Sequence, residues 1–193
     1  MNSFIFYFQI GWEHIISPDA LDHQLFITAL MASYLWDQWR QVLILVTAFT
    51  LGHSLTLALS AFDWIRMDEN WVEFLIPLTI VLTCLMNIYN WGSSGNRRRA
   101  QYVLAAAFGL IHGMGFANNI RFMLAKDENF ALNLLAFNVG LEVGQLAIVA
   151  LLLALGYLIV IKGKMARNHW SIFLTTASFS VALWITIQRI QSL

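Results

Sequence analysis

The stretch FTLGHSLTLAL, residues 49–59, is apolar throughout and carries a single histidine, His53, near its middle. It belongs to a longer apolar run over residues 40–62. A run of roughly 20 mostly apolar residues has the length that an α-helix needs to cross the hydrocarbon core of a bilayer. The stretch therefore predicts a transmembrane helix. Because inserting an ionisable group into a membrane costs free energy, the imidazole of His53 is expected to have a specific role.

The composition of the whole chain also indicates a membrane protein. Of the 193 residues, 59% are hydrophobic and only 11% are charged, whereas a soluble domain carries about a quarter charged residues. The net charge is zero, so electrostatics gives no reason to expect nucleic-acid binding. The single cysteine, Cys84, excludes an intrachain disulfide and is expected to be a buried, small hydrophobic side chain.

The hydropathy pattern predicts an all-α fold, a polytopic membrane helix bundle that forms one integral-membrane domain over residues 1–193. About six transmembrane helices are expected, over residues 21–36, 40–62, 71–91, 99–120, 130–161 and 170–190. The fifth is longer than a bilayer requires, so it should tilt or project. The opening stretch MNSFIFYFQIGWEHII lacks the features of a signal peptide and is expected to form a short interfacial or re-entrant helix.

Lysine and arginine in the short connections set the orientation of such a bundle. One side carries seven basic residues, Arg40, Arg97, Arg98, Arg99, Lys162, Lys164 and Arg167. The other side carries four, Arg66, Arg121, Lys126 and Arg189, together with most of the acidic residues. We therefore predict that the first side is cytoplasmic and that both termini are extracytoplasmic.

Several polar side chains fall at one depth of the predicted bundle, nearer its outer face. The predicted metal ligands among them are His14, Asp22, His23, His53, His112 and Glu142. Imidazoles and carboxylates that arrive from separate helices can close a tetrahedral or octahedral shell around a divalent metal ion. Asn138 and Gln145 share a helix face with Glu142 and are expected to support the ligands from behind.

Simpler interpretations of single residues stay open at this point. One intramembrane histidine can be a helix–helix hydrogen-bond partner, worth about 0.6 kcal/mol on average. Asp22 and His23 are adjacent and point about 100° apart, so one of them could orient a ligand rather than bind. A stripe of small residues is expected to let the fourth and fifth predicted helices approach each other, at Gly109, Gly113, Gly115, Gly140 and Gly144.

Four motifs in a fixed order resemble the HupE/UreJ family of bacterial membrane proteins. They are GWEHIISPDALDHQLFITAL (residues 11–30), TAFTLGHSLTLAL (47–59), GLIHGMGFA (109–117) and FNVGLEVGQL (137–146). The family is described as permeases for nickel or cobalt with six to eight helices, so the resemblance implies a multi-pass protein of the bacterial inner membrane. Its pattern carries over to His14, Asp22, His23, His53, His112, Asn138, Glu142 and Gln145. Met86 stands where the family pattern has a glutamate, which argues against a metal role for the third predicted helix.

Two functions are compatible with these residues. The resemblance favours a permease for Ni²⁺ or Co²⁺ with a His/Asp/Glu site in the outer half of the bilayer. The chemistry also allows a zinc-dependent intramembrane hydrolase acting on a lipid or a membrane-anchored peptide. In that enzyme, Glu142 or Asp22 would be the general base and Ser54 would orient the scissile carbonyl. Both functions require a divalent metal ion, and the sequence offers few polar groups deeper in the bundle to pass an ion onward.

Overall fold

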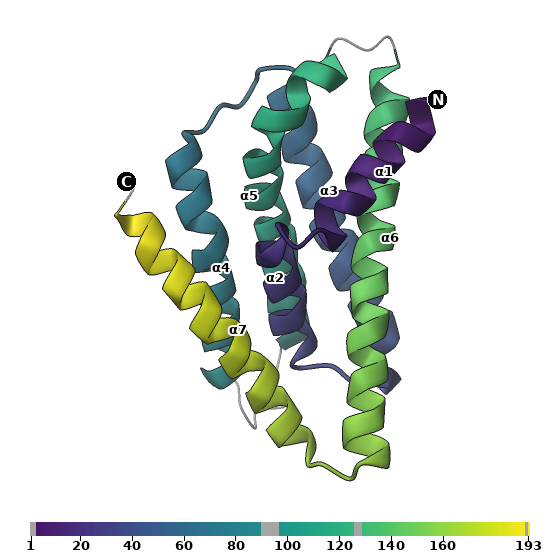
Figure 1. Ribbon diagram of the computed structural model, residues 1–193, viewed down its shortest axis with the longest axis vertical. Coiled ribbons are helices and arrows are strands. Elements are labelled where there is room, and N and C mark those ends of the chain that lie inside the picture. Colours follow the sequence, from purple (N-terminus) through teal and green to yellow (C-terminus); the bar gives the residue numbers. More distant parts are fainter. Residues whose placement is uncertain (1–2, 90–96, 126–128, 192) are drawn as a thin grey trace.

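The computed structural model of the chain is an all-α bundle (Figure 1), described over residues 3–89, 97–125, 129–191 and 193. No strand occurs in these ranges, as predicted. In chain order the helices are α1 (Ser3–Ile16), α2 (Leu21–Met31), the 3₁₀ turn η1 (Trp36–Gln38), α3 (Trp39–Ala61), α4 (Glu69–Tyr89), α5 (Arg97–Ala125), α6 (Phe130–Gly156), the π-helical turn η2 (Tyr157–Lys162) and α7 (Arg167–Ile190).

Several of these helices are long enough to cross a membrane. In the described residues four helical segments have the necessary length and hydropathy, Trp36–Ala61, Glu69–Tyr89, Phe130–Lys162 and Arg167–Ile190. Helix α5 is 29 residues long, but its apolar part within the described residues is Gln101–Ala117. The segment Phe130–Lys162 has 33 residues, which confirms that the fifth predicted helix exceeds the length that a bilayer requires.

The transmembrane helix predicted over residues 21–36 is wrong. Helix α2 has 11 residues, or about 16 Å at 1.5 Å per residue, which is too short for a hydrocarbon core of about 30 Å. The chain instead passes through the bundle in two pieces, with α1 reaching its middle and α2 continuing toward the opposite end (Figure 1). Pro18 explains the break, because proline disfavours a helical conformation at the residue before it. The position of the break agrees with the prediction, in which a short helix ends at residue 16 and the next helix begins at residue 21.

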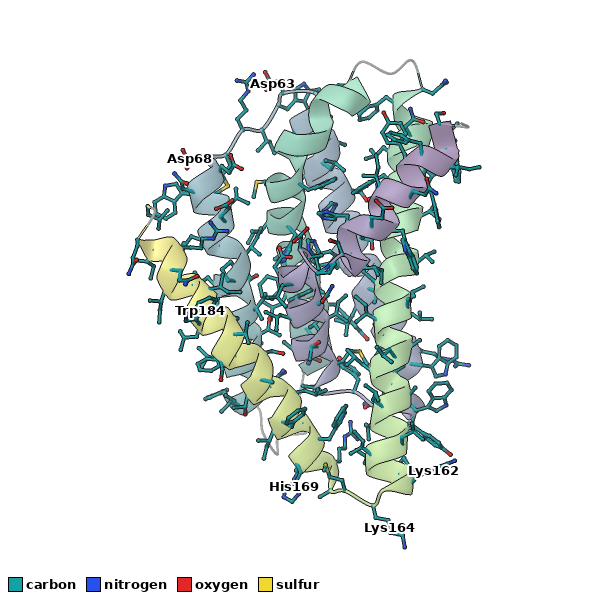
Figure 2. The ribbon with its side chains drawn as sticks, in the orientation of Figure 1. Asp63, Asp68, Lys162, Lys164, His169 and Trp184 are labelled. Carbon is teal, nitrogen blue, oxygen red and sulfur yellow. The ribbon has the colours of Figure 1, made fainter. Side chains whose placement is uncertain are left out.

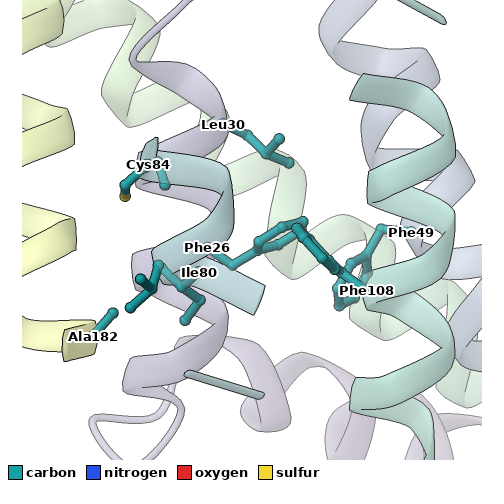
Figure 3. Packing of buried hydrophobic residues seen from close by; sticks show 9 residues of the cluster. Phe26, Leu30, Phe49, Ile80, Cys84, Phe108 and Ala182 are labelled. Atoms are coloured by element: carbon teal, nitrogen blue, oxygen red, sulfur yellow. The ribbon is translucent and has the colours of Figure 1, made fainter. Parts of the chain in front are cut away.

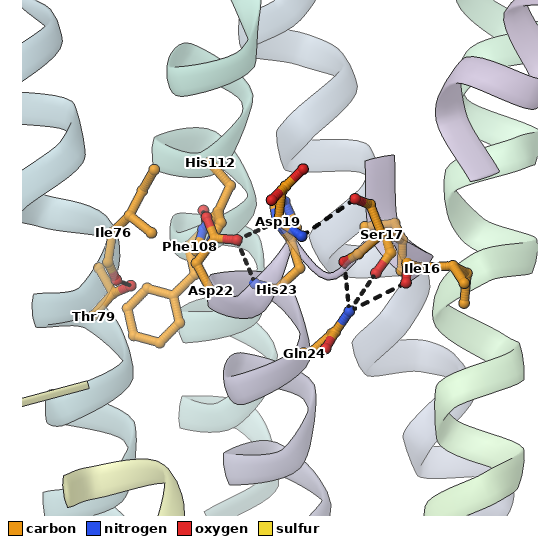
Figure 4. A network of polar contacts seen from close by, with 11 residues as sticks. Ile16, Ser17, Asp19, Asp22, His23, Gln24, Ile76, Thr79, Phe108 and His112 are labelled. Atoms are coloured by element: carbon orange, nitrogen blue, oxygen red, sulfur yellow. Dashed lines mark hydrogen bonds and ion pairs between the residues drawn. The ribbon is translucent and has the colours of Figure 1, made fainter. Parts of the chain in front are cut away.

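Side chains satisfy backbone carbonyl groups at the end of α1 and at the end of α2. Gln24 Nε2 donates to Ser17 O at 2.9 Å and to Ile15 O at 3.3 Å, which caps the end of α1 (Figure 4). At the other end, Asn87 Nδ2 of α4 donates to Ala29 O at 2.8 Å. Non-helical backbone at membrane depth is tolerated where the protein supplies such partners. These contacts therefore explain how a short helix can lie inside the bundle.

Helix α2 is packed on several sides by apolar residues of other helices (Figure 3). The cluster around it is formed by Phe26, Ala29, Leu30, Phe49, Ile80, Val81, Cys84, Phe108 and Ala182, which come from α2, α3, α4, α5 and α7. Cys84 is fully buried there, as predicted for a small hydrophobic side chain. The packing fixes α2 and, with it, the two polar residues of its first turn, Asp22 and His23.

Glycines bring two pairs of helices into close contact, and the pairs differ from the prediction. A Cβ atom added to Gly140 of α6 would lie 2.0 Å from Phe8 O of α1. A Cβ atom on Gly109 of α5 would lie 2.1 Å from Phe49 O of α3. Thus α6 packs on α1 and α5 packs on α3, and the expectation that these glycines join α5 to α6 is wrong. A small-residue face in the sequence shows that a close neighbour exists but does not say which helix it is.

Candidate metal centre

Four histidines from four helices meet at the level where α1 ends and α2 begins. His14 lies in the last turn of α1, His23 in the first turn of α2, and His53 and His112 lie within α3 and α5. The ring centroids of His14 and His23 are 4.7 Å apart, as are those of His23 and His112. His14 and His53 are 5.8 Å apart by the same measure. The break between the two short helices places His14 beside His23.

The potential ligand atoms form two overlapping sets, which share His23. One ring nitrogen from each of His14, His23 and His53 lies within 4.8 Å of the others. A carboxylate oxygen of Asp22 and ring nitrogens of His23 and His112 satisfy the same limit. Two ligands of one metal ion at about 2 Å are themselves roughly 3–4 Å apart, so small side-chain movements would close either set around an ion.

Five buried ring nitrogens of the histidines at this centre lack hydrogen-bond partners within the described part of the chain. The buried Nε2 atoms of His14, His23 and His112 accept and donate no hydrogen bond there, and neither ring nitrogen of His53 does so. A buried polar group without a partner costs about 1–3 kcal/mol. Several such groups at one place are best explained by a shared ligand, and the donor set fits a divalent metal ion.

Two hydrogen bonds orient the rings toward that role (Figure 4). His23 Nδ1 lies 2.9 Å from Asp22 Oδ1, and His112 Nδ1 lies 2.9 Å from Phe108 O. Both oxygens are acceptors, so each Nδ1 donates and each Nε2 keeps its lone pair, which is the form of imidazole that binds a metal. Asp22 therefore orients His23 and also belongs to one of the two ligand sets.

Phenylalanine rings surround the histidines and make the centre apolar on most sides. The rings involved are Phe26, Phe49, Phe116 and Phe137. Among them, Phe116 lies 3.9 Å from His14 and Phe137 lies 6.0 Å from His53, measured between ring centroids. In such a low-dielectric shell the charge of a bound ion would be only weakly screened, which favours negatively charged groups close by.

One open pocket reaches the centre, and acidic side chains line it. The pocket has a volume of ≈ 390 Å³ and is lined by Ile10, Glu13, His14, Ser17, Asp19, Ala20, Asp22, His23 and Phe116. Glu13 and Asp19 are exposed, whereas His23 is only 4% exposed. These two acidic residues are not among the predicted site residues. Glu13 precedes His14 directly and Asp19 lies three residues before Asp22, and this closeness in the sequence is the signal that could have found them.

The structure does not bring Glu142 to the other predicted ligands. Its Oε1 atom accepts a hydrogen bond from Thr47 Oγ1 of α3 at 2.7 Å, and it belongs to neither ligand set. One helical turn along, Gln145 Oε1 accepts from Thr50 Oγ1 at 3.0 Å. The face of α6 that meets the histidines instead presents Phe137, so the sequence placed Glu142 at the correct helix but on the wrong face.

The remaining predicted site residues make local contacts. Asn138 Nδ2 donates to Leu134 O of its own helix at 2.8 Å, and Ser54 Oγ donates to Thr50 O at 2.6 Å. Neither group is held toward the histidines by these bonds. Asn133, which is not among the predicted site residues, is fully buried, and its side-chain amide has no hydrogen-bond partner in the described residues.

Beyond the histidines, toward the ends of α2 and α6, the described interior is mainly apolar, apart from the buried pair of Thr50 and Gln145. The cluster there is formed by Ile27, Met31, Tyr34, Val42, Leu45, Val46, Ala105, Val149 and Leu153. A cavity of ≈ 20 Å³ lies beside it, and Gln145 is the one polar residue among its described lining. The centre is therefore open through the acidic pocket, whereas the described interior on this other side is mainly apolar.

Comparison with known proteins supports the motif assignment. The sequence matches the family described as HupE / UreJ protein over residues 1–190. No curated protein and no solved structure matches the chain. Because the match covers nearly all of the sequence, the resemblance predicted from the four motifs is confirmed, and the chain belongs to the HupE / UreJ family of proteins.

Proposed function

We propose that this chain is a divalent metal permease of the nickel/cobalt type that binds its cargo between His14, Asp22, His23, His53 and His112. The observation that carries the proposal is the group of unpartnered imidazole nitrogens from four helices beside an open, acidic pocket. Membership of the HupE / UreJ family supports the cargo, since the family is described as nickel or cobalt permeases. Imidazole is a suitable ligand for Ni²⁺, Co²⁺ and Zn²⁺ alike.

We also propose that the chain crosses the bacterial inner membrane about six times as one domain, with α1 and α2 together forming the first crossing. Two broken half-helices whose ends meet at an ion site are a recurrent feature of transporters. An even number of crossings agrees with the two termini, which lie toward the same end of the bundle (Figure 1).

The charges at the two ends of the bundle support an orientation. Lys162 and Lys164 lie at one end, and Asp63 and Asp68 lie at the other (Figure 2). Because lysine and arginine are enriched in cytoplasmic loops, the lysine end is proposed to be cytoplasmic. Both termini would then be extracytoplasmic, and the acidic pocket would receive ions from outside.

Metal analysis of the purified protein, combined with flux into proteoliposomes, tests this function. The wild-type protein should carry Ni²⁺ or Co²⁺ into vesicles, and His112→Ala should reduce the flux at least about 10-fold because a ligand is lost. His169→Ala is the matched control, since His169 is exposed at the start of α7 and belongs to neither ligand set. Tightly bound, stoichiometric zinc without any nickel or cobalt flux would contradict the proposal.

A zinc-dependent intramembrane hydrolase is the second candidate, and the mainly apolar interior beyond the histidines favours it. A fixed metal with an open pocket on one side resembles a catalytic site more than a pathway. Asp22 would then be the general base, because the hydrogen bonds of Glu142 and Ser54 engage those side chains elsewhere. Hydrolysis of lipids by the zinc-loaded protein, lost in Asp22→Asn, would support this candidate.

A further inference from the structure

We propose that the pocket lined by Glu13, Asp19 and Asp22 captures a hydrated divalent cation before the ion exchanges its water for imidazole. This inference rests on the proposed permease function and divides metal binding into two steps. In the first step, carboxylates hold the ion through its water shell. In the second, His14 and His23 replace those waters as the ion moves to the buried centre.

The size of the pocket supports the first step. Its volume is ≈ 390 Å³, and six water molecules occupy roughly 180 Å³ at about 30 Å³ each. A divalent ion with its full inner shell of water therefore fits. The histidine centre is far tighter, with the rings of His14 and His23 only 4.7 Å apart between centroids. Water must leave the ion between the two places.

The charges of the pocket support the choice of a cation. No ion pair within the described residues joins Glu13 or Asp19 to a basic side chain. Glu13 lies in the last turn of α1, where the carbonyl end of the helix adds a partial negative charge. Clefts lined by charges of one sign raise the local concentration of counter-ions and can increase association rates by about 10- to 1,000-fold.

His23 links the pocket to the buried centre. It lines the pocket, yet it is only 4% exposed and its Nε2 atom has no hydrogen-bond partner in the described residues. An ion that leaves the carboxylates therefore meets this unpartnered nitrogen next. His23 also belongs to both ligand sets, so it can keep hold of the ion while His14 and His53, or His112, complete the shell.

The two steps should differ in selectivity. Carboxylates and water are hard ligands that accept any divalent cation, including Mg²⁺, whereas imidazoles select transition metals. Mg²⁺ should consequently compete for the capture site without being transported. The pocket would then set the effective concentration of the cargo, and the histidines would set its identity.

Initial rates of Ni²⁺ uptake into proteoliposomes test the capture step. The double variant Glu13→Gln/Asp19→Asn should show about a 10-fold higher KM for Ni²⁺ and a weaker dependence on ionic strength. Its maximal rate, and the Ni²⁺ bound per protein at saturation, should be unchanged. Inhibition by Mg²⁺ should also be weaker than in the wild type. Asp68→Asn/Glu69→Gln removes the same charge outside the pocket and should behave like the wild type.

Two results would overturn the inference. An unchanged KM in the Glu13→Gln/Asp19→Asn variant would show that the pocket does not capture the ion. Loss of bound Ni²⁺ at saturation would show that these carboxylates are ligands of the final site. If the wild type binds Ni²⁺ but transports none, the permease function fails separately. The capture step is then tested by the rate of Ni²⁺ association in detergent, which should fall about 10-fold in the double variant.

Discussion

At the scale of single residues, His53 shows most clearly what the site requires. Its side chain is 0% exposed and both ring nitrogens lack partners in the described residues. A helix–helix hydrogen bond, the simpler interpretation that its sequence context allowed, is therefore not what the structure shows. Without a ligand, the imidazole costs free energy at this position. With a metal ion, one nitrogen gains a bond.

The difference between the metal-free and metal-bound imidazole predicts how His53→Leu changes the stability of the protein. In the metal-free protein the variant should be as stable as the wild type or more stable. The substitution removes a buried, unsatisfied polar group, which costs about 1–3 kcal/mol of folding free energy. With Ni²⁺ or Zn²⁺ added, only the wild type should gain stability, as binding to the folded state requires. Thermal unfolding in detergent, with a chelator and then with metal, measures both. Equal destabilisation of the variant in both conditions would indicate a purely structural histidine.

Asp22 is predicted to act mainly through His23, because the two side chains are hydrogen-bonded at 2.9 Å. Asp22→Asn should weaken metal affinity about 10- to 100-fold, the usual cost of losing a group that orients a metal-binding histidine. Isothermal titration with Zn²⁺ provides the measurement. Asp37→Asn, an exposed acidic residue in η1, is the control. An unchanged affinity in Asp22→Asn would exclude the orienting role.

The sequence predicted most of the residues that form the site. It predicted less well which side of its helix each residue occupies. Five predicted ligands lie close together, His14, Asp22, His23, His53 and His112. They could be predicted because each is a rare polar group in an apolar stretch. Glu142 satisfies the same criterion but points to Thr47. Depth along a helix follows from residue number, whereas rotation about its axis depends on packing, which one sequence does not define.

At the scale of elements, the break between α1 and α2 determines the geometry of the site. It places the last turn of one helix against the first turn of the next, with Gln24 capping the carbonyl end. The sequence predicted where the break lies, since a short helix is expected to end at residue 16 and the next to begin at residue 21. It did not predict that the second helix is too short to cross a membrane alone. The close pairing of α3 with α5 is equally important, since these helices supply His53 and His112.

That pairing gives a prediction for Gly109→Ala. The added methyl group would lie 2.1 Å from Phe49 O, so α3 and α5 must separate, at a cost of about 1–3 kcal/mol or more. Separation would also move His53 away from His112 and reduce metal affinity. Gly115→Ala is the matched control, because the closest atom to its added Cβ is the side-chain Cδ1 of Ile76 at 3.0 Å. Equal thermal stability and metal affinity in the two variants would contradict the close pairing.

At the scale of the whole molecule, the all-helical bundle and the family could be predicted from the sequence, because hydropathy and motif order involve the entire chain. The arrangement of helices could not, since the lipid-facing and packing surfaces of these helices are similarly apolar. In its described residues, the resulting bundle has an open acidic pocket at the histidines and a mainly apolar interior beyond them.

The central claim is that His14, Asp22, His23, His53 and His112 form one divalent metal centre. X-ray absorption spectroscopy of the protein loaded with one equivalent of Ni²⁺ or Zn²⁺ tests it most directly. We predict a shell with about three or four imidazole nitrogens at roughly 2.0–2.1 Å. Fewer imidazoles are expected in His53→Leu, and the shell should be unchanged in His169→Ala. A shell made of oxygen atoms alone, or one that His53→Leu leaves intact, would contradict the claim.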